Sequence, residues 1–238
     1  MKKLLIVKTG STYDAVKKQH GDFEDMLIAA MGIDRQYVEV FDAKDESLSF
    51  PVPDDYGGII ITGSHDMVTF EDDWMLDLEE WITGIADTGV PALGIGFGHQ
   101  AMVKAFGGKV DYRDWGPEIG YVKIRLEVEA YRDPLFSVLY DRFHAYQFHN
   151  QSVVVLPKSV QSLGANNIDY YQVLCYNKHM WSCQFHPEFT ADVLKKYIGI
   201  NAVLLTASDI DPYVLLTILE EDNNGQKLLK RFVEICDL

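Results

Sequence analysis

The stretch PALGIGFGHQAM, residues 91–102, is expected to decide the fold of this sequence. It begins with a short apolar run, and from His99 onward the residues carry the spacing of a helix. Between these two patterns stand alternate glycines, Gly94, Gly96 and Gly98. Such a pattern is typical of a strand that turns sharply into a helix around a reactive side chain. Gly96, at the apex of the turn, has no side chain.

The alternation of strand and helix extends from this turn toward the N-terminus. Apolar runs rich in β-branched residues predict strands at residues 3–8, 36–41, 58–62 and 91–95. Helical spacing predicts helices at residues 22–31, 72–87 and 99–106. Strands that alternate with helices in this way predict an α/β fold, with a mainly parallel central sheet flanked by helices on both faces.

The second half of the chain has a different pattern. Short strands are predicted at residues 121–126, 152–156, 171–176 and 180–185, and helices at residues 190–198 and 224–235. The strands predict a small antiparallel β addition. Because no linker or repeat interrupts the sequence, we expect one domain over residues 1–238, with a C-terminal helical extension from about residue 190.

Composition excludes several classes of function. The 21 Lys and Arg against 36 Asp and Glu give a formal charge of −15, which disfavours binding to nucleic acid or to a membrane surface. The N-terminal apolar run, residues 4–7, is too short for a signal peptide. The cysteines, Cys175, Cys183 and Cys236, lack metal-ligand spacing. We therefore expect a cytoplasmic protein with no metal and no cofactor.

Three segments are expected to meet at the carboxyl ends of the strands, where parallel sheets bind ligands. They are residues 62–65, 94–100 and 184–188. Glycines 94, 96 and 98 follow the fourth strand with the spacing GxGxG, so they do not form the dinucleotide fingerprint GxGxxG. In the third segment Pro187 restrains His186 and places Glu188 close enough to orient its imidazole, as the base of a nucleophile requires.

Together these segments resemble the class I glutamine amidotransferases, the family that includes the amidotransferase part of GMP synthetase. The resemblance covers about residues 1–200 and rests on four motifs: PALGIGFGHQ, TGSHDMVTFEDDW, HNQSV at residues 149–153, and QFHPEF. It implies a flavodoxin-like fold of three layers. It also implies hydrolysis of the side-chain amide of glutamine to glutamate and ammonia, through a Cys-His-Glu triad.

The resemblance assigns a role to individual positions of this sequence. Gly96 occupies the position of the cysteine nucleophile, and His186 and Glu188 match its base and orienting acid. The backbone N–H of Phe97, with one from Gly63 or Ser64, matches the oxyanion hole. Gln100, His149 and Asn150 match the residues that contact the substrate. His65 and His99 stay open between a structural and a functional role.

Glycine at position 96 removes the group that attacks the amide, and loss of the nucleophile from a comparable triad costs on the order of a millionfold in rate. Cys183 is three residues from His186 in a strand and is expected to point to the opposite face; Cys175 is expected in the core. Ser64 fits the oxyanion hole better than the nucleophile position. Two explanations stay open: a natural pseudoenzyme that binds glutamine, or a change introduced into an active enzyme.

The resemblance also leaves the acceptor and partner open. The segment after Glu188 has no phosphate-binding glycine loop and is too short for an ATP-using domain, so we expect a separate synthetase subunit as the recipient of ammonia. The alternatives are a hydrolase of γ-glutamyl amides and a non-catalytic module that senses glutamine. The loop at residues 111–118 is expected to form a pocket wall, a partner surface or a plain surface loop.

Overall fold

Short strands with alternating side chains form the centre of the sheet in the computed structural model, which describes residues 2–236 and 238. Leu4 and Ile6 pack into the apolar layer on one face, whereas Leu5 and Val7 pack into the layer on the other. This division follows from the two-residue period of a strand. The strands of this parallel region are β1 (Leu4–Lys8), β2 (Val38–Asp42), β3 (Gly58–Ile61), β4 (Ala92–Ile95) and β11 (Met180–Cys183).

Within the described residues, nine strands form one sheet in the order β2-β1-β3-β4-β11-β10-β9-β6-β7. Neighbours from β2 to β11 are parallel, and those from β11 to β7 are antiparallel. The antiparallel strands are β6 (Glu118–Leu126), β7 (Arg142–His149), β9 (Gln161–Ala165) and β10 (Val173–Asn177). A separate antiparallel pair joins β5 (Lys109–Tyr112) to β8 (Gln151–Val155). The predicted fold class is confirmed, and most of its antiparallel part continues the central sheet.

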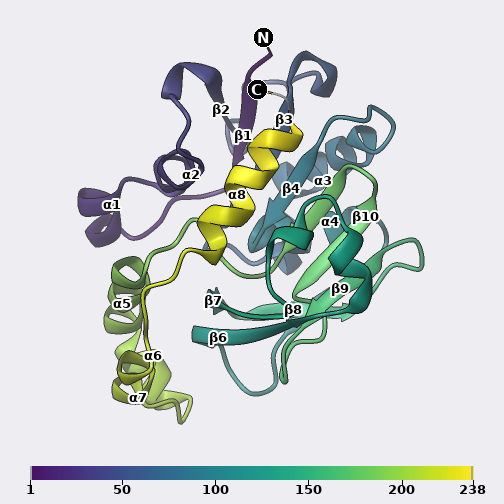
Figure 1. Ribbon diagram of the computed structural model, residues 1–238. Coiled ribbons are helices and arrows are strands. Elements are labelled where there is room, and N and C mark those ends of the chain that lie inside the picture. Colours follow the sequence, from purple (N-terminus) through teal and green to yellow (C-terminus); the bar gives the residue numbers. More distant parts are fainter. Residues whose placement is uncertain (1, 237) are drawn as a thin grey trace.

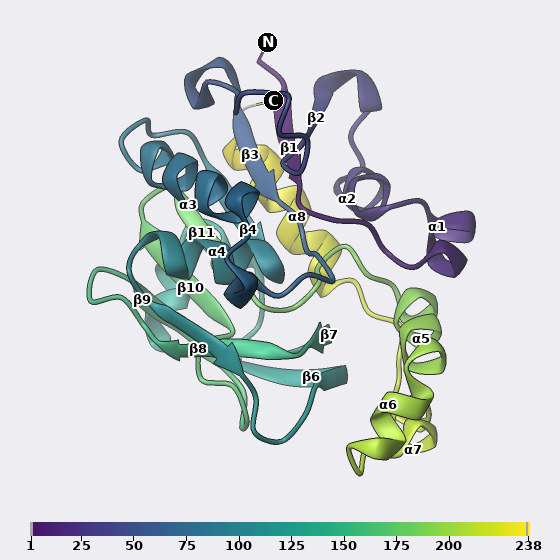
Figure 2. The same cartoon turned by 180° about the vertical axis from the view of Figure 1, so that it is seen from behind.

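Helices cover both faces of this sheet. α2 (Phe23–Met31) and α8 (Asn224–Ile235) pack on one face, where α8 crosses the sheet diagonally (Figure 1). α3 (Asp73–Ile85) and α4 (Phe97–Ala105) pack on the opposite face, which is seen from behind (Figure 2). The three layers place the carboxyl ends of β3, β4 and β11 at one edge, where the predicted site residues follow.

Four short helices extend this edge. α5 (Ala191–Ile200), α6 (Ala202–Ala207) and α7 (Pro212–Thr217) project together from the body (Figure 1), and α1 (Asp14–His20) packs against α5. The sequence did not predict α1, α6, α7, β5, β7 or β9, all of which are short or lie next to strong turn signals. Single turns of 3₁₀ helix occur at Arg35–Tyr37, Pro53–Asp55, Val68–Phe70, Val128–Arg132 and Phe136–Val138.

The division of the chain into domains stays a prediction. The C-terminal helix α8 returns to the central sheet, where Leu228, Leu229 and Phe232 are fully buried. Among the helices of the described residues, none is both long enough and apolar enough to span a membrane.

Candidate active site

Two glycines in the turn after β4 allow strand and helix to lie in contact. A β-carbon on Gly94 would lie 2.6 Å from the carbonyl oxygen of Gly98, and one on Gly98 would lie 2.4 Å from the carbonyl oxygen of Ile61. Both distances are shorter than any non-bonded contact of a real β-carbon. The close approach therefore requires glycine at both positions, and it fixes α4 directly against β3 and β4.

At position 96, the backbone dihedral angles rather than a close contact favour glycine. Its φ of +54° and ψ of −106° lie in a region that other residues rarely adopt. Its N–H donates to the carbonyl oxygen of Cys183 (3.0 Å), and its carbonyl accepts from the N–H of Gln100 (3.2 Å). The strand-to-helix turn thus holds the apex in a backbone geometry that glycine adopts freely and that would strain any other residue. A side chain at this position would project into the site.

His186 faces this apex. A β-carbon on Gly96 would lie 3.1 Å from Cε1 and 3.2 Å from Nε2 of His186. Nδ1–H of His186 donates to Oε1 of Glu188 (2.8 Å), and both side chains are buried. The ring of Phe189 stacks on the imidazole, with centroids 4.3 Å apart. Because Nδ1–H bonds the carboxylate, Nε2 is the ring nitrogen that faces position 96.

The loop after β3 approaches the same apex. A β-carbon on Gly63 would lie 2.8 Å from Cε1 of His186, so this loop passes directly beneath the imidazole. Among the described residues, no acceptor bonds the backbone N–H of Ser64 or of Phe97. The hydroxyl of Ser64 donates to Oδ2 of Asp66 (2.8 Å) and accepts from its N–H (3.1 Å). The backbone N–H groups of Ser64 and Phe97 are therefore available to a ligand, whereas the hydroxyl of Ser64 is already hydrogen-bonded to Asp66.

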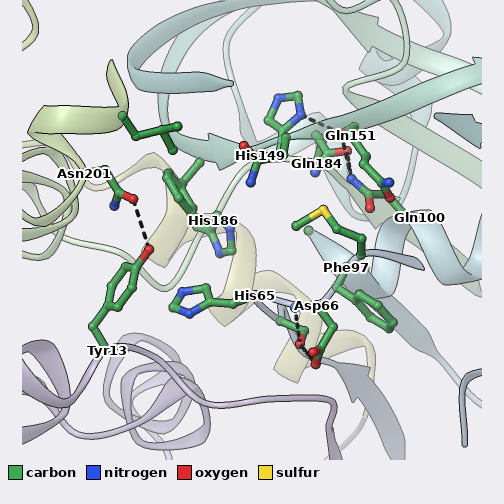
Figure 3. A pocket seen from close by; sticks show the side chains of 16 residues that line it. Tyr13, His65, Asp66, Phe97, Gln100, His149, Gln151, Gln184, His186 and Asn201 are labelled. Carbon is green, nitrogen blue, oxygen red and sulfur yellow. Dashed lines mark hydrogen bonds between the residues drawn. The ribbon is translucent and has the colours of Figure 1, made fainter. Parts of the chain in front are cut away.

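A cavity of about 160 Å³ opens over these residues. In the close view, Gln100, Gln151 and Gln184 gather on one side, and Tyr13 and Asn201 lie on the other, joined by a hydrogen bond (Figure 3). His186 and His65 lie between these two groups. The lining consists of Tyr13, Ser64, His65, Asp66, Met67, Gly96, Phe97, Gln100, Phe148, His149, Asn150, Gln151, Gln184, His186, Asn201 and Leu204. The structure thus brings together the candidate residues from all three predicted segments and from HNQSV.

Two of the candidate substrate contacts, Gln100 and His149, donate hydrogen bonds to the same backbone carbonyl, that of Gln151. Nε2 of Gln100 donates to the carbonyl oxygen of Gln151 (2.8 Å) and to Oε1 of Gln184 (3.0 Å). Nδ1–H of His149 donates to the same Gln151 oxygen (2.8 Å). Both hydrogens of the Gln100 amide are therefore used within the protein, and any ligand contact of Gln100 falls to its amide oxygen. The side chain of Asn150 also lines the cavity.

A buried carboxylate holds His149 from the other side. Glu118 lies opposite His149 in the β6–β7 register, and its Oε2 accepts from Nε2–H of His149 (2.8 Å). Both ring nitrogens of His149 thus face acceptors, which fixes the orientation of the imidazole. Burial raises the pKa of Glu118, but the hydrogen bond and charge of His149 outweigh burial and hold that pKa below its usual value.

Sequence analysis did not identify Glu118 as a site residue, because only the pairing of β6 with β7 reveals its partner. Asp169 lies nearby, and the ligand atoms of Glu118, His149 and Asp169 fall within 4.8 Å of one another, close enough for a metal site. However, Glu118 already accepts from Nδ2 of Asn166 (2.7 Å), and Asp169 accepts from the hydroxyl of Ser152 (2.9 Å). These donors favour a hydrogen-bonded network over metal ligation.

The two histidines that the sequence left open, His65 and His99, differ in position. His65 lines the cavity, its Nε2 lies 3.1 Å from the hydroxyl of Tyr197, and its ring packs against Tyr13. Burial, with a smaller effect from the charge of His186, lowers the pKa of His65 to about 4. His99 lies outside the cavity, where it bonds Ser182 (2.8 Å) and where burial lowers its pKa to about 4. His65 is therefore a neutral part of the cavity wall at neutral pH.

Neither candidate substitute thiol lines the cavity. Cys183 is fully buried in the apolar layer shared with α2 and α8, and burial raises its pKa well above the usual range. Sγ of Cys175 contacts the carbonyl oxygen of Asn177 (3.0 Å), and burial raises its pKa to about 11. In the loop at residues 111–118, Trp115 is exposed whereas Glu118 is buried.

Comparisons with known proteins agree with this geometry. The family profile described as Glutamine amidotransferase class-I matches residues 20–204. Gamma-glutamyl peptidase 4 of Arabidopsis thaliana is 30% identical over 81% of this chain and 78% of its own. The glutamine-hydrolysing GMP synthase of Petrotoga mobilis is 27% identical over 83% of this chain but only 36% of its own. A solved glutamine amidotransferase of Thermotoga maritima covers 100% of both chains with a TM-score of 0.76 at 20% identity, which shows the shared fold.

Proposed function

The chain belongs to the class I glutamine amidotransferase family, and on that premise we propose that its cavity binds the side-chain amide of glutamine or of a γ-glutamyl compound. One observation carries the proposal. A side chain at position 96 would project onto Nε2 of His186, at 3.2 Å from its β-carbon, while Glu188 fixes the opposite nitrogen. This is the arrangement of a nucleophile, a base and an orienting acid, with the nucleophile missing.

Each neighbouring group has a role in the family reaction. With a cysteine at position 96, His186 accepts the thiol proton and the thiolate attacks the amide carbon. The N–H groups of Phe97 and of the Gly63–Ser64 turn hold the oxyanion. His186 then gives its proton to the leaving nitrogen, ammonia departs, and water hydrolyses the thioester to glutamate. Gln100, His149 and Asn150 hold the amino-acid end of the substrate.

With glycine at position 96, the site is proposed to bind its ligand without turnover. Ser64 does not replace the nucleophile, because its hydroxyl is bonded to Asp66. Loss of the nucleophile costs on the order of a millionfold in rate in a comparable triad, so only residual hydrolysis is expected. With Gly96, the chain is therefore proposed to be a member of the family that binds glutamine but does not hydrolyse it.

The test combines binding with restored turnover. Calorimetry of the unaltered chain should show glutamine binding without release of glutamate, and the Gly96→Cys variant should release glutamate and ammonia. A His186→Ala change in the Gly96→Cys background should abolish turnover, whereas Cys183→Ser should leave it intact. If neither form binds glutamine or a γ-glutamyl compound, the cavity is a relict and the proposal fails.

A second candidate is hydrolysis of γ-glutamyl amides that carry a larger group than ammonia. Relatives named gamma-glutamyl peptidase match at an identity similar to that of the GMP synthase. The side chains of Tyr13, Asn201 and Leu204 border the same cavity and offer surface for such a group. Rates of the Gly96→Cys variant on glutamine and on a γ-glutamyl dipeptide separate the two candidates. A higher kcat/KM for the dipeptide favours the peptidase.

For the amidotransferase candidate, we propose a separate synthetase subunit as the recipient of ammonia and a cytoplasmic location. The relative named as a glutamine-hydrolysing GMP synthase supports a synthetase as the recipient. The three free cysteines support the second, since a reducing compartment keeps thiols unpaired. Fractionation of cells that express a labelled chain, followed by cross-linking to its neighbours, would test both.

A further inference from the structure

A second cavity concentrates positive charge on the antiparallel part of the sheet. It has a volume of about 470 Å³ and is lined chiefly by Lys123, Arg125, Arg142, Asn166, Asn167 and Tyr170. Three of these side chains are cations, and within the described part of the chain no acidic residue lines the cavity. Because the whole chain carries a formal charge of −15, this concentration is unlike the rest of the surface.

The strand register places two of the cations side by side. Arg125 of β6 lies directly opposite Arg142 of β7, and Lys123 lies two residues before Arg125 on the same face. Like charges directly opposite each other in an antiparallel pair are destabilising. Arg125 has an exposed ion pair with Glu127 (3.2 Å), whereas Lys123 and Arg142 form no ion pair with any residue that the structure describes. The fold therefore keeps two like charges opposite each other, and a bound anion would reduce the repulsion between them.

We propose that this cavity binds the phosphate group of a small phosphorylated molecule. Two guanidinium groups and one ammonium are the kinds of donor that phosphate oxygens accept. The ring of Tyr170, which is 71% exposed at the cavity, offers a flat surface for the organic part of the ligand. An extended polyanion is disfavoured, because the surrounding negative charge would repel it beyond the cavity. Apart from Asn166, whose amide donates to Glu118, the residues are distinct from those of the candidate active site, so this proposal stands independently of glutamine binding.

The test is calorimetry of the full chain with inorganic phosphate, ADP and ATP at low and physiological salt. We expect at least one of these to bind, and Arg142→Gln and Arg125→Gln to weaken it by about tenfold or more. Lys158, an exposed lysine outside the cavity, provides the matched control: Lys158→Gln removes the same charge and should leave affinity unchanged. Without ligand, Arg142→Gln should raise the melting temperature, because it removes the opposed pair.

Several results would overturn the proposal. The first is that none of the three anions binds. The second is equal weakening by Lys158→Gln and Arg142→Gln, which would indicate diffuse attraction to the whole molecule. The third is binding that occurs only with RNA or with an acidic peptide, which would assign the cavity to a macromolecular partner.

Discussion

The imidazole of His186 lies in the space into which a side chain of residue 96 would project. A β-carbon on Gly96 would approach its Cε1 to 3.1 Å and its Nε2 to 3.2 Å, which is closer than most contacts of real β-carbons. Any residue other than glycine must therefore displace the ring by a few tenths of an ångström. It must also adopt the backbone geometry of φ +54° and ψ −106°.

Gly96→Cys is expected to lower the free energy of unfolding by about 1–3 kcal/mol, because a non-glycine residue is strained at this φ and ψ. Gly96→Ala is the matched control: it introduces the same strain and the same β-carbon without a nucleophile. Urea denaturation of the three proteins measures the effect. A cysteine variant that is as stable as the glycine form and gains no glutaminase activity would contradict the assignment of the apex.

Gly63→Ala is expected to displace the imidazole of His186, because the added methyl group would lie 2.8 Å from Cε1. In the Gly96→Cys background, kcat should fall on the order of a hundredfold, as catalytic groups displaced by about 1 Å lose this much. Gly84→Ala in α3 meets no atom within 4 Å of its β-carbon among the described residues. This control should instead stabilise the helix by about 0.5–1 kcal/mol and leave kcat unchanged. Equal kcat for the two variants would show that the loop does not support His186.

Glu118→Gln removes the carboxylate that accepts a hydrogen bond from Nε2–H of His149. Glu118 also accepts from Asn166 and Gln172, so the change disrupts a buried hydrogen-bond network. A buried hydrogen-bonding group left without its partner costs about 1–3 kcal/mol, and the free energy of unfolding should fall by an amount in this range. Affinity for glutamine should also fall, because His149 and Gln100 share the carbonyl of Gln151. Glu127→Gln, at a partly exposed position just after β6, should change stability by less than about 0.5 kcal/mol. If affinity is unchanged while stability falls, Glu118 is a structural residue only.

Stability should decrease as pH falls from about 6.5 toward 4. His65 and His99 are buried, and burial lowers the pKa of each to about 4 in the folded state. The histidines of the unfolded chain take up protons at a higher pKa, about 6.5. Their contribution to the free energy of unfolding is therefore complete above about pH 6.5 and is lost as the pH falls toward the folded pKa of about 4. Each histidine contributes a slope of about 1.4 kcal/mol per pH unit within this window. Urea denaturation at several pH values measures this slope, and His65→Phe should reduce it by about 1.4 kcal/mol per pH unit. An unchanged slope would show that the pKa of His65 is the same in the folded and unfolded states.

The central sheet could be predicted from the sequence because its signals are local. Alternating and β-branched runs identified β1, β3 and β4, and the glycine pattern at Gly94, Gly96 and Gly98 located the sharp turn into α4. β7 (Arg142–His149) was not predicted, because its apolar residues, at 143, 145, 146 and 148, depart from strict alternation. The short helices α6 and α7 have few residues for a periodic pattern, and their packing beside α5 decides their conformation.

The sequence by itself determined the chemical types at the site: an apex without a side chain, and a histidine followed two residues later by a glutamate. These follow from local order along the chain, since His186 and Glu188 are two residues apart. Only the tertiary structure decided which distant groups they meet. The pairing of β6 with β7 places Glu118 against His149, and the same pairing sets Arg125 opposite Arg142. Such contacts depend on strand order and register across the whole sheet, which no local pattern encodes.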